Sequence, residues 1–399
     1  MRERLDRRGM AVLSGGHLTA DLCQGALPAL LPFLISQRGY SYGAASALVL
    51  AATVSSSVIQ PLFGHLSDRH SMPWLMPIGL LLGGVGIGLV GVMPNYALTF
   101  AAIVVSGLGV AAFQPEASRF ANYVSGARRA TGMSYFSVGG NLGFALGPAI
   151  VTPLVLLLGL HGTPVITLIP AGMALVVLLQ LPHLVSFRVG RHSARTGAQG
   201  LRPDAWGPFA RLAAVVAARS VLYFGLMTFV PLYFVHDLHT SKGSAGVVLT
   251  LMLLGGAAGT LVGGPAADRY GRRQVLLVSM ALVAPLVAIM LALSPVAAAA
   301  LLVVVGATTV ATFSVTVVMG QEYLPSRIGI ASGVTLGLSI GLGGVGAALL
   351  GLLADATGLH TVLWTIAAMP IIAVALVLTL PADRRRARVR RAAPATARS

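Results

Sequence analysis

The second half of the chain repeats the plan of the first half about two hundred residues later. The segment Gly64–Arg69 recurs as Gly264–Arg269, and Pro32 ahead of the first copy recurs as Pro231 ahead of the second. Each copy follows a long apolar stretch, at the point where charged residues reappear. Two parallel halves of membrane helices are typical of secondary transporters, whose halves rock around a central site. The repeat therefore predicts a two-part membrane protein that carries a solute.

The composition indicates that lipid surrounds this chain. Hydrophobic residues make up 56% of it and charged residues 10%, and its mean hydropathy is +0.85. A soluble domain has about a quarter of its residues charged, so a water-soluble fold could not hide this much apolar surface. Cys23 is the single cysteine, which excludes an internal disulfide. The basic start precedes an apolar stretch too long for a signal peptide, and we expect it to remain as a cytoplasmic anchor.

About twelve apolar segments each approach the roughly twenty residues that a helix needs to cross a bilayer. They are 10–36, 43–66, 74–93, 96–121, 129–158, 162–186, 208–235, 243–266, 274–294, 296–321, 328–353 and 360–381. The pattern predicts an all-α membrane protein with about twelve transmembrane helices in two pseudo-symmetric six-helix bundles. The expected units are an N-terminal bundle, a cytoplasmic linker, a C-terminal bundle and a basic cytoplasmic tail, at 1–186, 187–207, 208–383 and 384–399.

The net charge of +16 is distributed asymmetrically along these segments. Arginines occupy alternate loops and the tail, whereas the opposite loops hold only Arg38 and Lys242. Because cytoplasmic loops carry the excess of Lys and Arg, we expect both termini in the cytoplasm and the protein in the cell's inner (plasma) membrane. The basic tail is then a topology signal and a contact for anionic lipids, which argues against nucleic acid as a partner.

Strings of glycine mark equivalent helices of the two halves. Gly139–Pro148 lies in the fifth apolar segment, and six glycines between Gly333 and Gly346 lie in the eleventh. Small residues let membrane helices approach at backbone distance. Tight packing and a sliding interface between moving helices are both compatible with this pattern.

The second copy of the repeated loop, Gly264–Arg273, has the complete pattern G-x-x-x-D-R-x-G-R-R. A glycine here lets a neighbouring helix come close, and an Asp near a helix end can accept hydrogen bonds from backbone donors or pair with a cation. The pattern resembles the cytoplasmic signature of the major facilitator superfamily, although His70–Trp74 replaces its usual residues after the first copy. The gate positions of the two copies are Gly64, Asp68, Arg69, Gly264, Asp268, Arg269 and Arg272.

Further motifs narrow the resemblance to the fosmidomycin-resistance family of exporters, from His17 to about Asp355. The motifs are Gln60–Pro61, Asp68, Met72–Trp74, Pro77–Gly79, Pro115–Arg119, Gly139–Asn141 and Gln321–Pro325. The resemblance implies a twelve-helix exporter driven by the proton gradient, with small drugs such as the phosphonate fosmidomycin among its substrates. One departure is Gln114, which stands where the family pattern F-H-P-E has histidine.

Charged residues deep inside two apolar segments point to a site independently of the family. Asp21 lies about eleven residues into the first segment, and Arg219 about eleven residues into the seventh, so a rise of about 1.5 Å per residue puts both near the midplane. A charge there costs at least about 2.5–3.5 kcal/mol unless it has a partner or a water-filled cavity. We expect Asp21 or Glu116 to load and release a proton, and Arg219 to bind an anionic substrate group. The alternative is a permanent Asp21–Arg219 ion pair that only orders the two halves.

Other polar residues have weaker assignments. His17, Asp21 and Gln24 share one helix face, at positions i, i+4 and i+7. Substrate contacts and interhelical hydrogen bonds are both open for four side chains: His17, Gln24, Gln114 and Asn141. Arg119 can pair with Glu116 three residues earlier, and Arg119 and Glu322 lie near the cytoplasmic surface, where a gate-closing salt bridge is expected.

Two other classes of function compete with a coupled exporter. An uncoupled facilitator, or an importer of another small organic solute, would use the same architecture. An enzyme is disfavoured, because no second cluster completes a metal site with His17 and Asp21 and no Ser–His or P-loop pattern appears. We therefore expect no metal and no cofactor, with protons as the coupling ion. The expected partners are a small-molecule substrate, protons and membrane lipids, and we expect a monomer.

Overall fold

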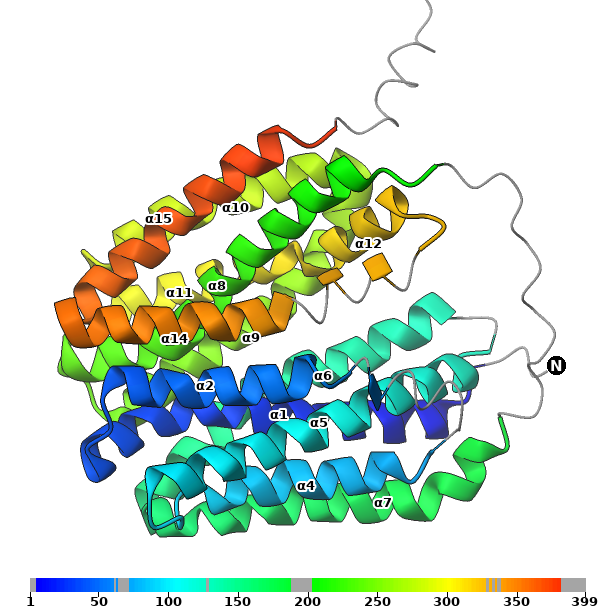
Figure 1. The fold of residues 1–399 in the computed structure, drawn as a ribbon, viewed down its shortest axis with the longest axis horizontal. Helices are drawn as coiled ribbons and strands as arrows, with labels where there is room; N and C mark the ends of the chain where they lie inside the picture. Colours follow the sequence, from blue (N-terminus) through cyan, green and yellow to red (C-terminus); the bar gives the residue numbers. More distant parts are fainter. Residues whose placement is uncertain are drawn as a thin grey trace, which may run out of the picture.

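The structure is a computed structural model that describes residues 5–60, 62–63, 72–126, 129–187, 203–327, 330–331, 334–335 and 339–381. Within these ranges the chain forms helices and no strand. The helices form two groups, one below the other in Figure 1, with the first half of the chain in the lower group and the second half in the upper. The predicted tail and most of the predicted linker lie outside the described residues.

In the described part of the first half there are six α-helices and one short 3₁₀ helix. They are α1 (Arg7–Arg38), α2 (Tyr42–Ser57), α4 (Leu75–Leu89), α5 (Tyr96–Val124), α6 (Arg129–Leu158), η1 (Leu160–Thr167) and α7 (Leu168–Val185). Most connections are short, and capping side chains define where several helices begin. The Asp6 carboxylate accepts a hydrogen bond from Gly9 N at the start of α1, and Ser41 and Asn95 cap α2 and α5 in the same way.

The second half has the corresponding series of helices. They are α8 (Trp206–His236), α9 (Lys242–Tyr270), α10 (Arg272–Met290), α11 (Pro295–Ala311), α12 (Phe313–Tyr323), α14 (Ser339–Thr357) and α15 (Leu359–Leu378). Ten helical stretches are long and apolar enough to cross a membrane, with α11 and α12 counted together, and α2 and α4 are shorter apolar helices. The prediction of about twelve membrane helices is thus confirmed for the described chain.

The tenth predicted segment, 296–321, differs from the expectation because its helix is interrupted. The break falls at Thr312, where φ is −87° and ψ is −3°, between α11 and α12. Thr308 and Thr309 each donate to the carbonyl of Val305, at 3.0 and 2.7 Å. Threonine hydroxyls that bond to the carbonyls of their own helix favour bending of that helix. Hydropathy detects the length of such a segment but not a break in it.

The two ends of the molecule differ in how the halves meet. We call the end where α1 begins and α15 ends the terminal end, and the other the distal end; they lie on the right and left of Figure 1. At the distal end the Asp355 carboxylate on α14 accepts hydrogen bonds from Tyr42 N (2.7 Å) and Gly43 N (2.8 Å), at the start of α2 in the other half. A carboxylate at a helix N-terminus is favoured by the helix dipole. Lys242 Nζ also donates to Ser36 Oγ across the halves, at 2.5 Å.

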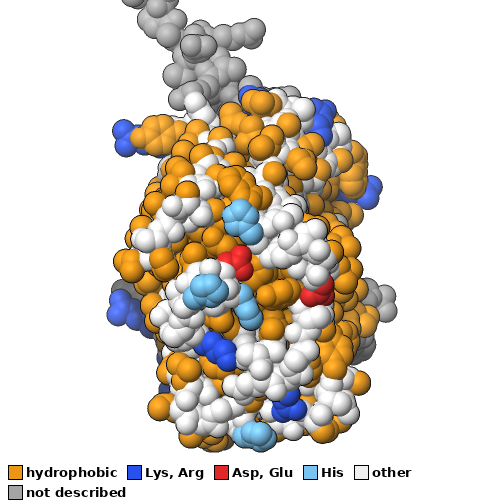
Figure 2. Space-filling model, turned by 90° about the vertical axis from the view of Figure 1, so that its left-hand side faces the viewer, with side chains coloured by type: hydrophobic (Ala, Val, Ile, Leu, Met, Phe, Trp, Pro, Cys, Tyr) orange, Lys and Arg blue, Asp and Glu red, His pale blue; other side chains and the backbone are white. Residues whose placement is uncertain are grey.

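Histidine and acidic side chains gather in the middle of this distal face (Figure 2). The Tyr42 ring of α2 meets the ring of His236, at the end of α8, edge-on with centroids 5.8 Å apart. Burial raises the pKa of the adjacent Asp237 carboxyl, and the nearby histidines His360, His236 and His239 oppose that shift. The distal contact between the halves therefore combines hydrogen bonds, an aromatic contact and charges.

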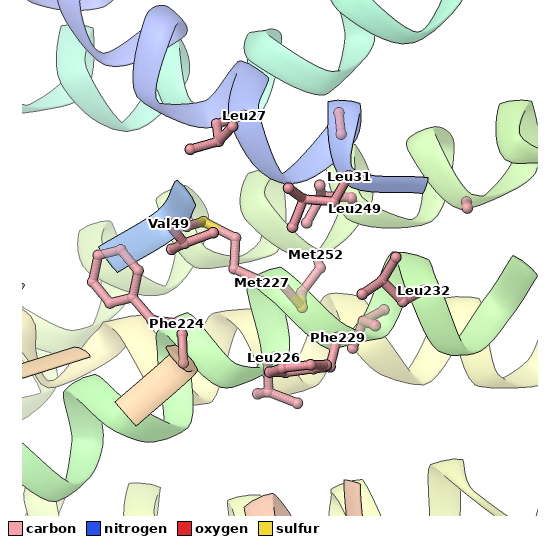
Figure 3. Close-up of a cluster of buried hydrophobic side chains, with 14 of the residues drawn as sticks. Leu27, Leu31, Val49, Phe224, Leu226, Met227, Phe229, Leu232, Leu249 and Met252 are labelled. Carbon is pink, nitrogen blue, oxygen red and sulfur yellow. The ribbon is translucent and has the colours of Figure 1, made fainter. Parts of the chain in front are cut away.

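An apolar cluster between the halves lies beneath this distal contact. Figure 3 shows Leu27 and Leu31 of α1 above Met227, Phe229 and Leu232 of α8. Val49 of α2 and Leu249 and Met252 of α9 belong to the same buried cluster. Because these side chains come from helices of both halves, the cluster separates the middle of the molecule from the distal side.

The terminal end shows the opposite arrangement. The ion pairs that described residues form there each join residues of one half. They are His183–Asp6, Arg119–Glu116, Arg272–Glu322 and Arg327–Asp204. The structure is thus a conformation in which hydrogen bonds between described residues of the two halves occur at the distal end.

Glycines set the spacing of two helix pairs. A Cβ on Gly143 of α6 would overlap the carbonyl oxygen of Leu18 on α1, so the glycine string of the fifth segment packs tightly inside one half. In the eleventh segment, a Cβ on Gly344 of α14 would overlap Thr53 of α2, which belongs to the other half. The glycine string of the fifth segment therefore packs tightly within one half. In the eleventh segment, Gly344 lies at the contact between the two halves. Gly333 and Gly337 lie outside the described residues.

The closest approach along α9 was not anticipated from the sequence. Gly255, Gly259 and Gly263 are spaced one turn apart, and a Cβ on each would overlap a carbonyl oxygen of α11. By contrast, Gly264, the glycine of the signature, has open space where its Cβ would lie. The expectation that Gly264 permits the close approach is therefore wrong, because its neighbour Gly263 lies on the face that touches α11.

Candidate functional site

Asp21 lies in the middle of α1 with 7% of its surface exposed. Its Oδ1 accepts hydrogen bonds from Gln24 Nε2 at 3.3 Å and from Gln114 Nε2 of α5 at 3.1 Å. Its Oδ2 lies 3.3 Å from His17 Nε2. All of these partners come from the first half of the chain. The structure therefore brings together four of the residues that the sequence selected: His17, Asp21, Gln24 and Gln114.

Both ring nitrogens of His17 face oxygen atoms, one from the Phe136 carbonyl group and one from the Asp21 carboxyl group. The Nδ1 atom lies 2.8 Å from the carbonyl oxygen of Phe136, which can only accept, so Nδ1 carries a hydrogen. The ring also stacks on Phe136, with centroids 4.1 Å apart, which fixes its orientation. Nε2 then faces the Asp21 carboxyl group, and the two bond only if one of them carries a further proton. A hydrogen bond between them would make the pair an imidazolium with a carboxylate, or a neutral imidazole with a carboxylic acid.

Gly140 on α6 makes room for this pair. A Cβ at this position would lie 2.5 Å from the His17 ring and 2.6 Å from Asp21 Oδ2. The sequence indicated Gly140 only as part of a packing string, and no local signal tied it to the two side chains. The adjacent Asn141, which was expected to contact substrate, is half-buried on the same helix.

Arg219 occupies the equivalent depth in the second half. It is 4% exposed in the middle of α8, and its Nε atom has no hydrogen-bond partner within the described chain. The guanidinium carbon lies 5.3 Å from the ring centre of Phe313, the first residue after the break at Thr312. A buried cation is costly without an anion or other charged partner, whereas an aromatic face compensates only in part. The arrangement can accept an anion.

Asp21 and Arg219 form no ion pair with each other in this structure, although both are described. The donors around Asp21 belong to its own half, and Arg219 faces Phe313 of its own half. The alternative of a permanent Asp21–Arg219 pair therefore does not hold in this conformation. Tyr223, one turn after Arg219 on α8, is a further polar side chain of this helix that the sequence reasoning missed.

Glu116 has a different environment from Asp21. It is completely buried on α5, and its Oε1 accepts hydrogen bonds from Arg119 at 2.5 Å and from Met72 N at 2.8 Å. Met72 lies just ahead of α4, so the carboxylate anchors the start of that helix to α5. Two donors from the same half hold Glu116 in place, and charge-assisted bonds of this kind are strong. This geometry favours an anchoring role over proton coupling.

The expected gate bridge between Arg119 and Glu322 is not formed. Arg119 pairs with Glu116, and Glu322 on α12 pairs with Arg272 at the start of α10. Each of these pairs joins residues of one half only, because the two halves contact each other at the distal end in this conformation. The two glutamates have equivalent contacts, since Glu116 accepts from Met72 N just ahead of the third helix of its half and Glu322 pairs with Arg272 at the start of the third helix of the other half.

The remaining gate positions are exposed, or they belong to residues that the structure does not describe. α9 continues through Gly264 to Tyr270, and Asp268 and Arg269 are exposed near its end. The Arg269 guanidinium carbon lies 5.3 Å from the centre of the Tyr270 ring. The corresponding residues of the first copy, Gly64, Asp68 and Arg69, lie outside the described residues. Over the described ranges, no group of three or more His, Cys, Asp or Glu side chains could hold a metal ion.

Comparison with solved structures identifies the fold. A mutant form of the nucleoside transporter NupG matches with a TM-score of 0.77 at 16% identity, covering 94% of this chain and 100% of that chain. A bacterial homolog of the human lysosomal transporter Spinster, in an inward-facing and occupied conformation, matches with a TM-score of 0.76 at 13% identity, covering 92% and 95%. These identities are low, so the likeness concerns the fold alone.

Relatives in sequence identify the family. The chain is 32% identical over 379 residues to an uncharacterized MFS-type transporter, YfnC, of Bacillus subtilis (strain 168), covering 92% of this chain and 91% of the relative. It is 31% identical over 382 residues to the fosmidomycin resistance protein of Escherichia coli (strain K12), covering 94% and 93%. The family model of the Major Facilitator Superfamily matches residues 13–236 and 212–399. The chain therefore belongs to the Major Facilitator Superfamily and is a multi-pass membrane transporter.

Proposed function

We propose that this transporter exchanges protons for small organic anions and exports them across the inner membrane, with phosphonates such as fosmidomycin among its substrates. The observation that carries the proposal is the pair of midplane sites. Arg219 is a buried cation whose Nε has no partner among the described residues, and in the other half His17 Nε2 lies 3.3 Å from Asp21 Oδ2, close enough for the two groups to hold a proton between them. The similarity to the fosmidomycin resistance protein supports the substrate class and the outward direction.

The positive-inside pattern supports the orientation. If the terminal end faces the cytoplasm, the distal contacts of Asp355 and Lys242 and the apolar cluster of Figure 3 close the outer side. The structure then corresponds to an inward-facing state, in which a cytoplasmic anion would enter between the halves. Alternating access would follow when the distal contacts open and the terminal ends meet. A bridge between Arg119 and Glu322 would then require each of them to exchange its present partner in its own half.

The chemistry of exchange requires that a proton and a substrate compete. Arg219 can bind a phosphonate or carboxylate with two donors, because its guanidinium is planar and stays charged. A substrate that also carries a hydroxyl or N–H group would donate it to the deprotonated Asp21 carboxylate. A proton arriving at His17–Asp21 removes that acceptor and weakens substrate binding, so proton entry releases the substrate outside.

Proton-coupled uptake is the second candidate, and the charges themselves favour it. An anion at Arg219 is repelled by a deprotonated Asp21 and is less repelled once Asp21 is neutral. Without a substrate donor to Asp21, the anion and the proton would therefore bind together and move in the same direction. The two candidates differ in the sign of their response to a pH gradient.

The test is transport in proteoliposomes with an imposed pH gradient of either sign. Labelled fosmidomycin is compared with a cationic dye, for the parent protein and for Asp21→Asn. Exchange predicts that fosmidomycin accumulates on the acidic side, and cotransport predicts accumulation on the alkaline side. Asp21→Asn should lose gradient-driven accumulation while it still equilibrates substrate. Gradient-driven accumulation that survives unchanged in Asp21→Asn would remove Asp21 from the coupling, and transport of the dye alone would remove the anion site.

A further inference from the structure

A groove of about 570 Å³ runs along the second half, between α9, α10 and α11. Its lining is almost entirely apolar, and several lining side chains are strongly exposed. Val262 is 67% exposed and Val278 is 52% exposed, on α9 and α10 respectively. Exposed aliphatic side chains on membrane-spanning helices face acyl chains. The groove is therefore open to the surrounding lipid.

The groove exists because α9 and α11 touch through their backbones. Gly259 and Gly263 lie against the carbonyl oxygens of Ala307 and Ala311, and these four residues also line the groove. Small residues leave the space beside the contact unfilled, and α10 forms its other wall. Ser279 of α10 donates to the Thr308 carbonyl of α11, which fixes the floor of the groove.

The length of the groove matches one leaflet. Its α9 wall extends from Ala258 to Tyr270, which is about 18 Å at about 1.5 Å per residue. Half of a hydrocarbon core of about 30 Å is about 15 Å. A volume of about 570 Å³ over a length of about 18 Å leaves a mean cross-section of about 32 Å², so one extended acyl chain fits the groove better than a helix, which is about 10 Å wide with its side chains. The groove thus spans the leaflet at the terminal end.

A cation lies at the mouth of the groove. Arg269 is exposed, and its guanidinium packs over the ring of Tyr270, which itself lines the groove. The next basic residue, Arg272, is paired with Glu322, and Arg273 donates to carbonyls at the end of α15. Gln274 lines the mouth as well and is exposed. The neighbouring Asp268 is exposed, about 100° around the helix from Arg269.

We propose that this groove binds one acyl chain of an anionic phospholipid, whose phosphate is held by Arg269 and Gln274. The arginine of the second signature copy then has a lipid contact in this conformation. The site is independent of the proposed substrate path, because its lining belongs to the outer flank of one half. Lipid binding here would persist whatever the transported solute is.

The experiment measures lipid binding to the full-length detergent-solubilised protein by native mass spectrometry. Dioleoylphosphatidylglycerol and dioleoylphosphatidylcholine are titrated separately. The first phosphatidylglycerol should bind more tightly than phosphatidylcholine. Arg269→Gln should weaken phosphatidylglycerol binding by about fivefold, the effect of one cation near an anionic lipid surface, and weaken phosphatidylcholine less, because the choline cation offsets the charge of its phosphate. Ala258→Phe should weaken both lipids, because its ring fills the inner part of the groove.

Matched controls separate the groove from general effects. Ile371→Phe enlarges a side chain that is 63% exposed on α15, outside the groove, and Arg7→Gln removes an exposed cation of the first half. Both should bind lipid as the parent does. Val262→Phe is a second filling variant at an exposed wall position, in case Ala258→Phe does not fold. Equal binding of the two lipids with no effect of Arg269→Gln, or equal losses in the Ile371→Phe control, would overturn the proposal.

Discussion

Asp21 and Arg219 occupy equivalent depths in equivalent helices, yet their surroundings are opposite. Asp21 has partners from three side chains, His17, Gln24 and Gln114, whereas the Nε of Arg219 has none and its guanidinium faces the Phe313 ring. A buried charge with a complete set of partners is suited to exchange a proton locally. A buried charge that lacks a counter-ion is suited to bind one from outside the protein. Equivalent positions of the repeat therefore hold two different chemical environments.

The largest expected effect concerns Arg219, the buried charge that lacks a counter-ion. Arg219→Ala should lower transport of an anionic substrate by at least about thirtyfold, because truncating one partner of a buried charge pair costs about 2–5 kcal/mol. Arg219→Lys should retain part of it. The melting temperature should change little, because Arg219 Nε has no hydrogen-bond partner among the described residues and loss of the Phe313 contact is offset by removal of a buried charge in Arg219→Ala. A large fall in stability with unchanged transport would show that Arg219 is structural. Proteoliposome uptake and thermal unfolding measure the two quantities.

A smaller effect concerns Asp21, the buried charge that has a complete set of partners. Gly140→Ala forces a Cβ against the His17 ring and Asp21 Oδ2 and should cost about 1–3 kcal/mol of stability through overpacking. Gradient-driven transport should fall with it. Gly172→Ala on α7 is the matched control, because its Cβ would meet open space and helical Ala is favoured over Gly. Equal behaviour of the two variants would show that Gly140 is not tied to the His17–Asp21 pair.

A third prediction concerns the distal contact between Asp355 and the start of α2, which keeps the Asp21 and Arg219 sites open to the terminal end. Asp355→Ala removes the cap on Tyr42 N and Gly43 N and should cost about 1 kcal/mol, the typical value for a lost N-cap. That shifts a two-state equilibrium by about fivefold toward distal opening. Distances between spin labels across the distal end would report the shift. An unchanged distribution would show that the contact does not set the equilibrium.

The smallest effect lies at the terminal end of the second half. The hydrogen bond from Ser326, opposed by partial desolvation and supported by Arg327, holds the pKa of the Asp204 carboxyl below its ordinary value. A depressed acid stabilises the fold above its unfolded pKa, and this contribution is lost as the pH falls through the folded pKa. Asp204→Asn should therefore be slightly less stable than the parent at neutral pH and indistinguishable from it in strong acid. Unfolding followed at several pH values measures this difference, and a constant difference would contradict it.

Much of the fold could be predicted from the sequence because lipid imposes a length on each helix. The segment 129–158 was predicted with the bounds that α6 has, and the depth of Asp21 and Arg219 followed from counting residues. The break at Thr312 could not be predicted, since hydropathy does not report backbone hydrogen bonding. The same limit explains why α2 ends at Ser57, ahead of the predicted 66.

The candidate site could be predicted only in part. Spacing along α1 gave the shared face of His17 and Asp21, but the Gln114 contact depends on how α5 is rotated, which sequence spacing does not determine. The Arg119–Glu322 bridge failed for a different reason. Its formation depends on the conformational state of the transporter, and each residue has a competing partner in its own half.

The interruption at Thr312 has a mechanical consequence. Upstream of it, α11 is clamped to α9 by the glycines at 255, 259 and 263 and cannot tilt alone. Downstream of it, Glu322 in the last turn of α12 forms an ion pair with Arg272 at the start of α10. The break at Thr312 would allow α12 to change its angle relative to α11 when the terminal ends close. Phe313 is the first residue of α12, so a change in the angle of α12 during gate closure would move the Phe313 ring relative to the Arg219 guanidinium.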